Sequence, residues 1–96
     1  MSFELGFLVD ALREWAKLDN GIREQFKKKL AERLIAPRVA AALLSGQRDR
    51  YKIKLRSVGY RLVYEVRDKQ LIVVVVAVGK RERNAVYKAA ARRPSC

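Results

Sequence analysis

Five residues in the C-terminal half of the chain have side chains suited to chemistry at a phosphate: Lys52, Lys54, Arg61, Arg81 and Tyr87. Like charges held together disfavour protonation, so we expect one lysine to have a lowered pKa and to transfer protons near neutral pH. Arginine stays charged and its planar fork matches phosphate oxygens, which suits Arg61 and Arg81 to stabilising charge in phosphoryl transfer. Tyr87 could stack on a base or hydrogen-bond a reacting hydroxyl. Spacing alone favours a simpler interpretation, a solvated basic face that binds phosphates without turnover.

The residue types that the sequence lacks exclude several kinds of catalytic and metal site. The chain has no histidine, which excludes His-based acid–base catalysis, Ser/His triads and most zinc sites. A metal would need clustered His, Cys or carboxylates, and Glu65 and Asp68 are isolated in the sequence, so we expect neither a metal nor a cofactor. The segment Gly79-Lys80-Arg81 lacks the preceding glycine spacing of a phosphate-binding P-loop.

The charge is large and uneven. Against 10 Asp and Glu, the 96 residues carry 22 Lys and Arg, a formal charge of +12. Residues 36–96 account for +11 of this excess. Such an excess predicts a polyanionic partner, either nucleic acid or an acidic protein, because solubility alone needs less charge. The run Lys27-Lys28-Lys29 is most simply a solvated helix face.

Length and composition predict one domain over residues 1–96, since 50% of the residues are apolar. The single cysteine, Cys96, excludes an intrachain disulfide and favours a reducing compartment. The longest apolar run, Leu71–Val78, is too short to span a membrane. The beginning, Met1-Ser2-Phe3-Glu4, does not have the pattern of a signal peptide. We therefore expect a cytoplasmic protein.

The hydrophobic pattern predicts an α+β fold of order β-α-α-β-β-β-α, with a mostly antiparallel four-stranded sheet and helices packed on it. Alternation over residues 3–7 predicts the first strand. Asp10 is expected to cap the first helix, with Leu12 in its apolar stripe. A second helix, with apolar residues at every fourth position from Ile22 to Leu34, is expected to end before Pro37.

A β-hairpin is expected next, because two alternating segments, residues 51–55 and 60–66, flank a short turn. Their apolar faces coincide if Leu55 lies opposite Tyr60. This register places Lys54 opposite Arg61 on the other face, with Lys52 two residues away. The run Leu71–Val78 does not alternate, which predicts a central strand that is covered on both faces. Arg81, just beyond it, would join the hairpin cations if that strand neighbours the hairpin.

At this point the residues resemble a known family. The segment YKIKLRSVGYRLVY over residues 51–64 resembles the hairpin of the RelE toxins of bacterial toxin–antitoxin systems. The segment VGKRER over residues 78–83, followed by Val86-Tyr87, resembles their C-terminal motif, and Arg23-Glu24-Gln25 with residues 27–30 is also similar. The resemblance covers nearly the whole chain. It implies a microbial-RNase-like RelE/ParE fold and an endoribonuclease that cleaves mRNA in the ribosomal A site and so inhibits translation.

The resemblance also implies a mechanism that needs no metal. In it the 2′-hydroxyl attacks the adjacent phosphate and leaves a 2′,3′-cyclic phosphate and a 5′-hydroxyl. Lys52, Lys54, Arg61, Arg81 and Tyr87 all match the family's active-site positions. By this resemblance Lys52 or Lys54 transfers protons, Arg61 stabilises charge on phosphorus, Arg81 holds the phosphate and the leaving oxygen, and Tyr87 orients the nucleotide or its 2′-hydroxyl. The resemblance leaves open which residue is the base and which the acid.

The implied partners are the ribosome, mRNA and an acidic RelB-type antitoxin. The toxin alone is expected to be a monomer, and its larger complex with the antitoxin could bind operator DNA. Two alternatives remain: a ParE-type toxin with the same fold that acts on a protein such as gyrase, and a non-catalytic RNA- or DNA-binding module. ParE-type toxins generally lack the lysine pair and the arginines, so Lys52, Lys54 and Arg81 weigh against the first.

Overall fold

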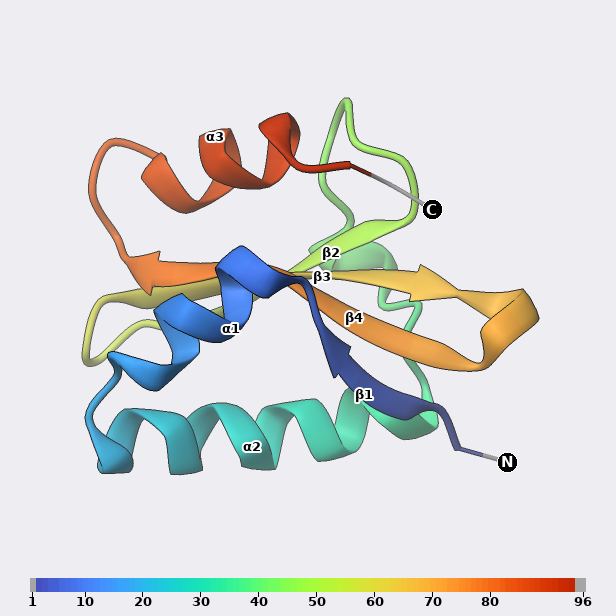
Figure 1. Ribbon diagram of the computed structural model, residues 1–96, viewed down its shortest axis with the longest axis horizontal. Helices are drawn as coiled ribbons and strands as arrows, with labels where there is room; N and C mark the ends of the chain where they lie inside the picture. The colour runs from blue at the N-terminus through green and yellow to red at the C-terminus, as the bar shows by residue number, and fades with distance from the viewer. Residues whose placement is uncertain (1, 95–96) are drawn as a thin grey trace.

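Strands and helices follow one another in the order expected from the sequence, over residues 2–94, which the computed structural model describes (Figure 1). The elements are β1 (Glu4–Phe7), α1 (Val9–Ala16), α2 (Asn20–Ile35), β2 (Arg50–Leu55), β3 (Tyr60–Arg67), β4 (Ile72–Lys80) and α3 (Ala85–Arg92). Two short 3₁₀ turns lie at Ala40–Ala42 and Asp68–Gln70. Among these described residues, none of the helices is both long and apolar enough to cross a membrane.

The strands form one mixed sheet in the order β1-β4-β3-β2. The β2–β3 and β3–β4 pairs are antiparallel, whereas β1 runs parallel to β4. The hairpin register is the expected one, with Leu55 opposite Tyr60 and Lys54 opposite Arg61. The apolar run forms β4, a central strand that lies beside β3 of the hairpin. This confirms the expectation that the strand before Arg81 neighbours the hairpin.

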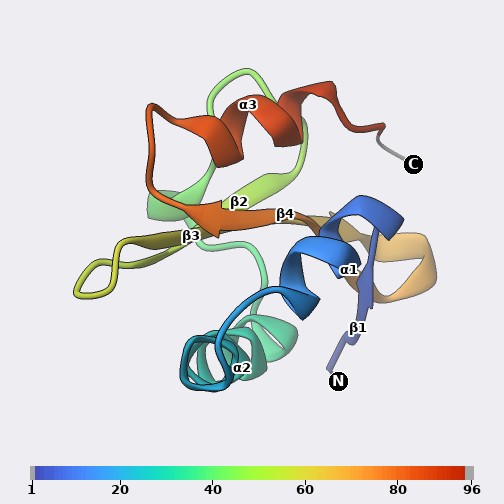
Figure 2. The same cartoon turned by 60° about the vertical axis from the view of Figure 1, so that its left-hand side comes forward.

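Helices cover the two faces of the sheet (Figures 1 and 2). The long helix α2 lies on one face and α3 on the other, while α1 packs beside β1 and β4. Buried residues on the α2 side include Phe26, Ile53 and Tyr64. On the α3 side they include Val63, Val76 and Ala90. The two-sided burial of β4 explains why its sequence does not alternate.

Three local expectations need correction. Asp10 does not cap α1, because the helix already begins at Val9 and its N-cap residue is Leu8. Leu12 was expected in the apolar stripe of the same helix, but its side chain is exposed. The helix instead turns its neighbour Ala11 toward the core. Leu71 lies outside β4 with a left-handed backbone (φ 54°), in the turn that feeds the strand. The end of α2 is as expected, with Pro37 two residues after Ile35.

Candidate active site

The hairpin brings basic side chains together on the face that α3 partly covers. Lys52 and Lys54 lie at alternate positions of β2, and Arg61 is the cross-strand partner of Lys54. Arg81 comes from the chain just after β4, where its backbone N–H donates to the carbonyl oxygen of Gly59 at 2.7 Å. We call Lys52, Lys54, Arg61 and Arg81 the cationic cluster. Three of them, Lys54, Arg61 and Arg81, line a pocket of about 210 Å³ beside the hairpin turn.

A β-bulge in β4 decides which way Arg81 faces. Val63 pairs with Ala77 and Tyr64 with Val75, so Val76 is an extra residue on β4. Val75 lies in the core on the α2 side, whereas Val76 and Ala77 both lie in the core on the α3 side. The alternation is therefore shifted by one beyond the bulge. Gly79 consequently faces α3, and Arg81, two residues further, joins the cationic cluster.

The cluster lowers the pKa of Lys54 from its usual value. The largest cause is the charge of Lys52, followed by partial burial and then by Arg61, with Arg56 and Arg81 adding to the effect. This direction confirms the expectation that crowded cations disfavour a protonated lysine. A larger share of Lys54 is therefore neutral, and able to accept a proton, than for an isolated lysine at the same pH.

Tyr87 of α3 contacts Arg61 of the cationic cluster. Its ring lies under the guanidinium of Arg61, whose Cζ is 5.0 Å from the ring centroid. Arg61 Nη1 also donates to Asn84 Oδ1 at 3.0 Å, just before α3. Burial raises the pKa of Tyr87, and the charge of Arg61 partly opposes this. Within residues 2–94, Arg61 Nε and the Tyr87 hydroxyl are buried without a hydrogen-bond partner.

Comparison with known proteins identifies the family. The family model of the ParE toxin of the type II toxin–antitoxin system parDE matches residues 6–85. The chain belongs to this family. Within it, the chain is 55% identical over 93 residues to the mRNA interferase toxin RelE of Escherichia coli K12, covering 97% of this chain and 98% of the relative. The mRNA interferase RelE of Shigella flexneri matches to the same extent.

Solved structures agree with the RelE assignment. A mutant of E. coli RelE in the free state superposes with a TM-score of 0.88 at 52% identity, covering 96% of this chain and 97% of that one. RelE in the intact E. coli RelBE toxin–antitoxin complex gives a TM-score of 0.81 at 55% identity, covering 85% and 100%. Within the family whose model bears the name ParE, this chain is thus of the RelE type.

The structure adds two residues to this RelE-type site that sequence reasoning missed. Arg56 lines the same pocket as Lys54 and helps to lower its pKa. Arg56 directly follows the strand that carries the two lysines, so the sequence alone could have predicted that it belongs to the site. Asn84 holds the Arg61 guanidinium, and only the fold brings it there. Among the described residues, no group of three or more His, Cys, Asp or Glu side chains gathers to hold a metal.

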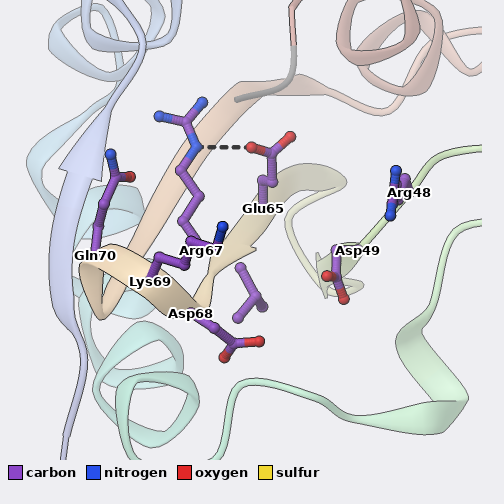
Figure 3. Close-up of a pocket in the computed structure, with 8 residues that line it drawn as sticks. Arg48, Asp49, Glu65, Arg67, Asp68, Lys69 and Gln70 are labelled. Carbon is purple, nitrogen blue, oxygen red and sulfur yellow. Dashed lines mark hydrogen bonds and ion pairs between the residues drawn. The ribbon is translucent and has the colours of Figure 1, made fainter.

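A larger pocket of about 550 Å³ lies at the other end of β3 in this toxin (Figure 3). Its lining mixes acids and bases: Arg48, Asp49, Glu65, Val66, Arg67, Asp68, Lys69 and Gln70. Asp49 and Asp68 are both paired with Arg38, and Arg67 is paired with Glu65. These pairs cancel much of the local charge. The smaller basic pocket is therefore the better match to a polyanion.

Proposed function

We propose that this toxin cleaves mRNA in the ribosomal A site and thereby inhibits translation. The observation that carries the proposal is the pocket in which Lys54, with its lowered pKa, faces Arg61 and Arg81. Proton transfer and charge stabilisation at a phosphate are the two functions that phosphodiester cleavage needs when no metal takes part. Its relatives, 55% identical, are named mRNA interferases, which supports RNA as the substrate.

The proposed reaction is an internal transfer at one phosphate. The 2′-hydroxyl loses its proton and its oxygen bonds to phosphorus, while the bond from phosphorus to the 5′ oxygen breaks. That oxygen takes up a proton, so the products are a 2′,3′-cyclic phosphate and a 5′-hydroxyl. Of the two lysines, Lys54 is better suited to proton transfer, because its neighbours lower its pKa.

The remaining roles follow from position. Arg61 stabilises the negative charge that develops on the phosphoryl oxygens, because it lines the same pocket as Lys54. Arg81, which lines the same pocket, holds the phosphate and the leaving oxygen. Lys52 keeps the pKa of Lys54 low and adds positive potential. Tyr87, buried against Arg61, orients the nucleotide or its 2′-hydroxyl.

The partners proposed for this chain follow its chemistry and its relatives. E. coli RelE has been solved in a complex with the antitoxin RelB, and we propose an acidic antitoxin of that type here. We propose that the toxin, residues 1–96 as one domain, is monomeric when alone. With its antitoxin it forms a larger complex that binds operator DNA. It acts in the cytoplasm, where translating ribosomes are found.

The ribosome is needed because this site has cations but no histidine to orient a free, flexible RNA. Holding reactants in a productive geometry can remove several kcal/mol of an activation barrier, and the A site can supply that geometry. The test is toeprinting of a translated message with the toxin, beside the same message without ribosomes. Cleavage only on ribosomes supports the proposal, and equally rapid cleavage of naked mRNA contradicts it. Inhibition of gyrase without any cleavage would instead identify a ParE-type activity.

A further inference from the structure

Helix α3, which presents Tyr87, cannot hold its position by itself. It has eight residues, and isolated helices shorter than about 12–15 residues are marginal in water. The two residues before it, Arg83 and Asn84, have left-handed backbones, and Asn84 does not cap the helix with its side chain. The buried side chains of Val86 and Ala90 hold one face of α3 to the sheet. Its orientation therefore depends on contacts from elsewhere.

Arg50 of β2 provides such a contact at the C-terminal end of α3. Its side chain is only 3% exposed. Nη1 donates to the carbonyl oxygen of Ala90, and Nη2 donates to that of Arg93 at 2.9 Å. The last carbonyls of a helix lack partners within the helix and carry its negative dipole end. The Ala90 carbonyl also accepts from the backbone N–H of Arg93 at 3.0 Å. The buried Arg50 guanidinium gives it a second donor and places a positive charge at the negative end of the helix.

A glutamate and a glutamine keep the Arg50 guanidinium in this position. Glu65, its cross-strand partner, accepts from Arg50 Nε at 3.0 Å. Glu65 also accepts from Arg67 Nε at 2.7 Å (Figure 3). Gln47 accepts from Arg50 Nη1 at 3.2 Å, and its amide nitrogen donates to the backbone oxygen of Tyr87 at 3.3 Å. Arg50, Glu65 and Arg67 form what we call the anchor cluster. Through Gln47 it also reaches the residue that contacts Arg61.

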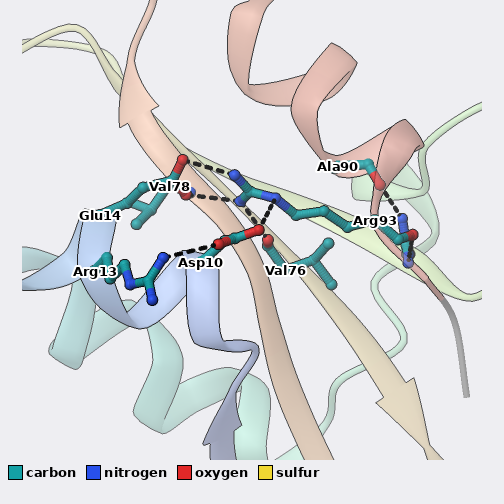
Figure 4. Close-up of polar contacts among 8 residues, drawn as sticks. Asp10, Arg13, Glu14, Val76, Val78, Ala90 and Arg93 are labelled. Carbon is teal, nitrogen blue, oxygen red and sulfur yellow. Dashed lines mark hydrogen bonds and ion pairs between the residues drawn. The ribbon is translucent and has the colours of Figure 1, made fainter.

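The other side of the same helix end is tied to α1. The Arg93 side chain donates to both carboxylate oxygens of Glu14, at 2.8 and 2.9 Å, and to the backbone oxygen of Val76 (Figure 4). Glu14 in turn accepts from the backbone N–H of Val78. These contacts hold the end of α3 beside β4. The contacts of Arg50 approach from β2 and set how the helix lies over the hairpin.

We propose that Arg50 is a positioning residue for RNA cleavage, because it holds α3 so that the Tyr87 ring stays against the Arg61 guanidinium. The inference rests on the proposed function, in which Tyr87 orients the substrate. Arg50 is buried beneath the helix and acts only through α3. A displacement of about 1 Å in a reacting group can cost about 100-fold in rate. The loss on removing Arg50 is therefore bounded by the loss on removing Tyr87 itself.

The test is a cycle of single-turnover cleavage rates on programmed ribosomes. Arg50→Ala alone would leave Glu65 short of a partner and could unfold the protein, so the pair is replaced together as Arg50→Leu/Glu65→Leu, a change often tolerated for buried ion pairs. The matched control, Arg38→Leu/Asp68→Leu, also removes one cation and one anion, from an ion pair that does not contact α3. Each double variant is made with Tyr87 and with Tyr87→Ala.

Positioning predicts that the Arg50/Glu65 double variant slows cleavage by about 10- to 100-fold with Tyr87 present. It predicts that the double variant causes no further slowing when Tyr87→Ala is already present. The control, Arg38→Leu/Asp68→Leu, should not change the rate with Tyr87 or with Tyr87→Ala. Titration of the tyrosines by ¹³C NMR gives a second readout. Tyr87 should ionise at a lower pH in the double variant, since burial is what raises its pKa.

The outcomes separate this inference from the proposed function. Equal slowing in both backgrounds means that Arg50 acts on general stability, and this overturns the positioning role. The role is also overturned if Tyr87→Ala slows cleavage but the Arg50/Glu65 double variant does not. If Tyr87→Ala leaves the rate unchanged, the proposed function of Tyr87 fails first and the positioning role fails with it.

Discussion

One face of the β2–β3 hairpin carries two groups of charged side chains that differ in burial and in pairing. Toward the ends of β2 and β3 that lie under α3, the anchor cluster is buried and compensated: Arg50 and Glu65 are 2% and 3% exposed and paired. Nearer the hairpin turn, Lys52, Lys54 and Arg61 are partly exposed, and the charges that act on Lys54 are those of other cations. The same alternation in sequence produces both groups.

The difference comes from the residue across the strand. Register pairs Arg50 with Glu65, an anion, but pairs Lys54 with Arg61, another cation. The first pair can be covered by a helix because its charges cancel and its hydrogen bonds are satisfied. The second must stay near solvent, where its unbalanced field can attract a polyanion. The face thus combines a rigid support with a reactive, open end.

The largest effect on stability is expected at the anchor cluster. Arg50→Ala removes a hydrogen-bonded cation from the buried Glu65 carboxylate, and breaking a buried pair costs ~3–5 kcal/mol, here toward the lower end because Arg67 still pairs with Glu65. Chemical denaturation measures the loss. Lys52→Ala, two residues along β2, is the control and should cause little loss, because it removes repulsion. Similar losses in the two variants would mean that the clusters do not differ in structural role.

The largest effect on chemistry is expected at the cationic cluster. Arg81→Ala should slow single-turnover cleavage by about 10²–10³, or ~2.7–4 kcal/mol, as loss of one charge-stabilising donor does. Ribosome affinity should change little, since many other cations remain. Arg83→Ala removes the same charge two residues later and should affect the chemical step far less. Equal slowing by both changes would assign the effect to net charge.

Salt dependence should also separate the two clusters. Binding to ribosomes should weaken as salt rises, because phosphate contacts release counterions. Lys54→Met should reduce the slope of log affinity against log salt by about 1, the value for one phosphate contact. Arg50→Leu/Glu65→Leu, neutral overall and buried, should leave the slope unchanged. A flat salt response of the unmodified toxin would show that the basic face does not dock on RNA.

The smallest effect is on the reactivity of Lys54. Lys52 is the main cause of its lowered pKa, so Lys52→Met should raise that pKa toward its usual value. At a fixed pH near 8 less of the amine is then neutral, so acylation of Lys54, followed by mass spectrometry, should be slower. Lys69→Met, which removes a lysine outside the cluster, should not change it. If both variants slowed acylation equally, Lys52 would not be the specific cause of the lowered Lys54 pKa.

The sequence by itself determined much of this protein. Period-two alternation predicted the hairpin and its register, because a half-buried strand must send apolar side chains to one face. That register placed Lys54 opposite Arg61 before any coordinates, and it equally places Arg50 opposite Glu65, a pair that was open to prediction. The roles proposed for Lys52, Lys54, Arg61, Arg81 and Tyr87 still await the rate measurements above.

Only the tertiary structure decided where Arg81 and Tyr87 point. The run from Leu71 to Val78 has no alternation, so nothing in it marks Val76 as the bulged residue that turns Arg81 toward the cationic cluster. Likewise, the pattern of α3 shows which side is apolar but not where the helix ends dock. That depends on Arg50 and Arg93 meeting carbonyls and carboxylates from distant segments, contacts that exist only once the sheet has formed.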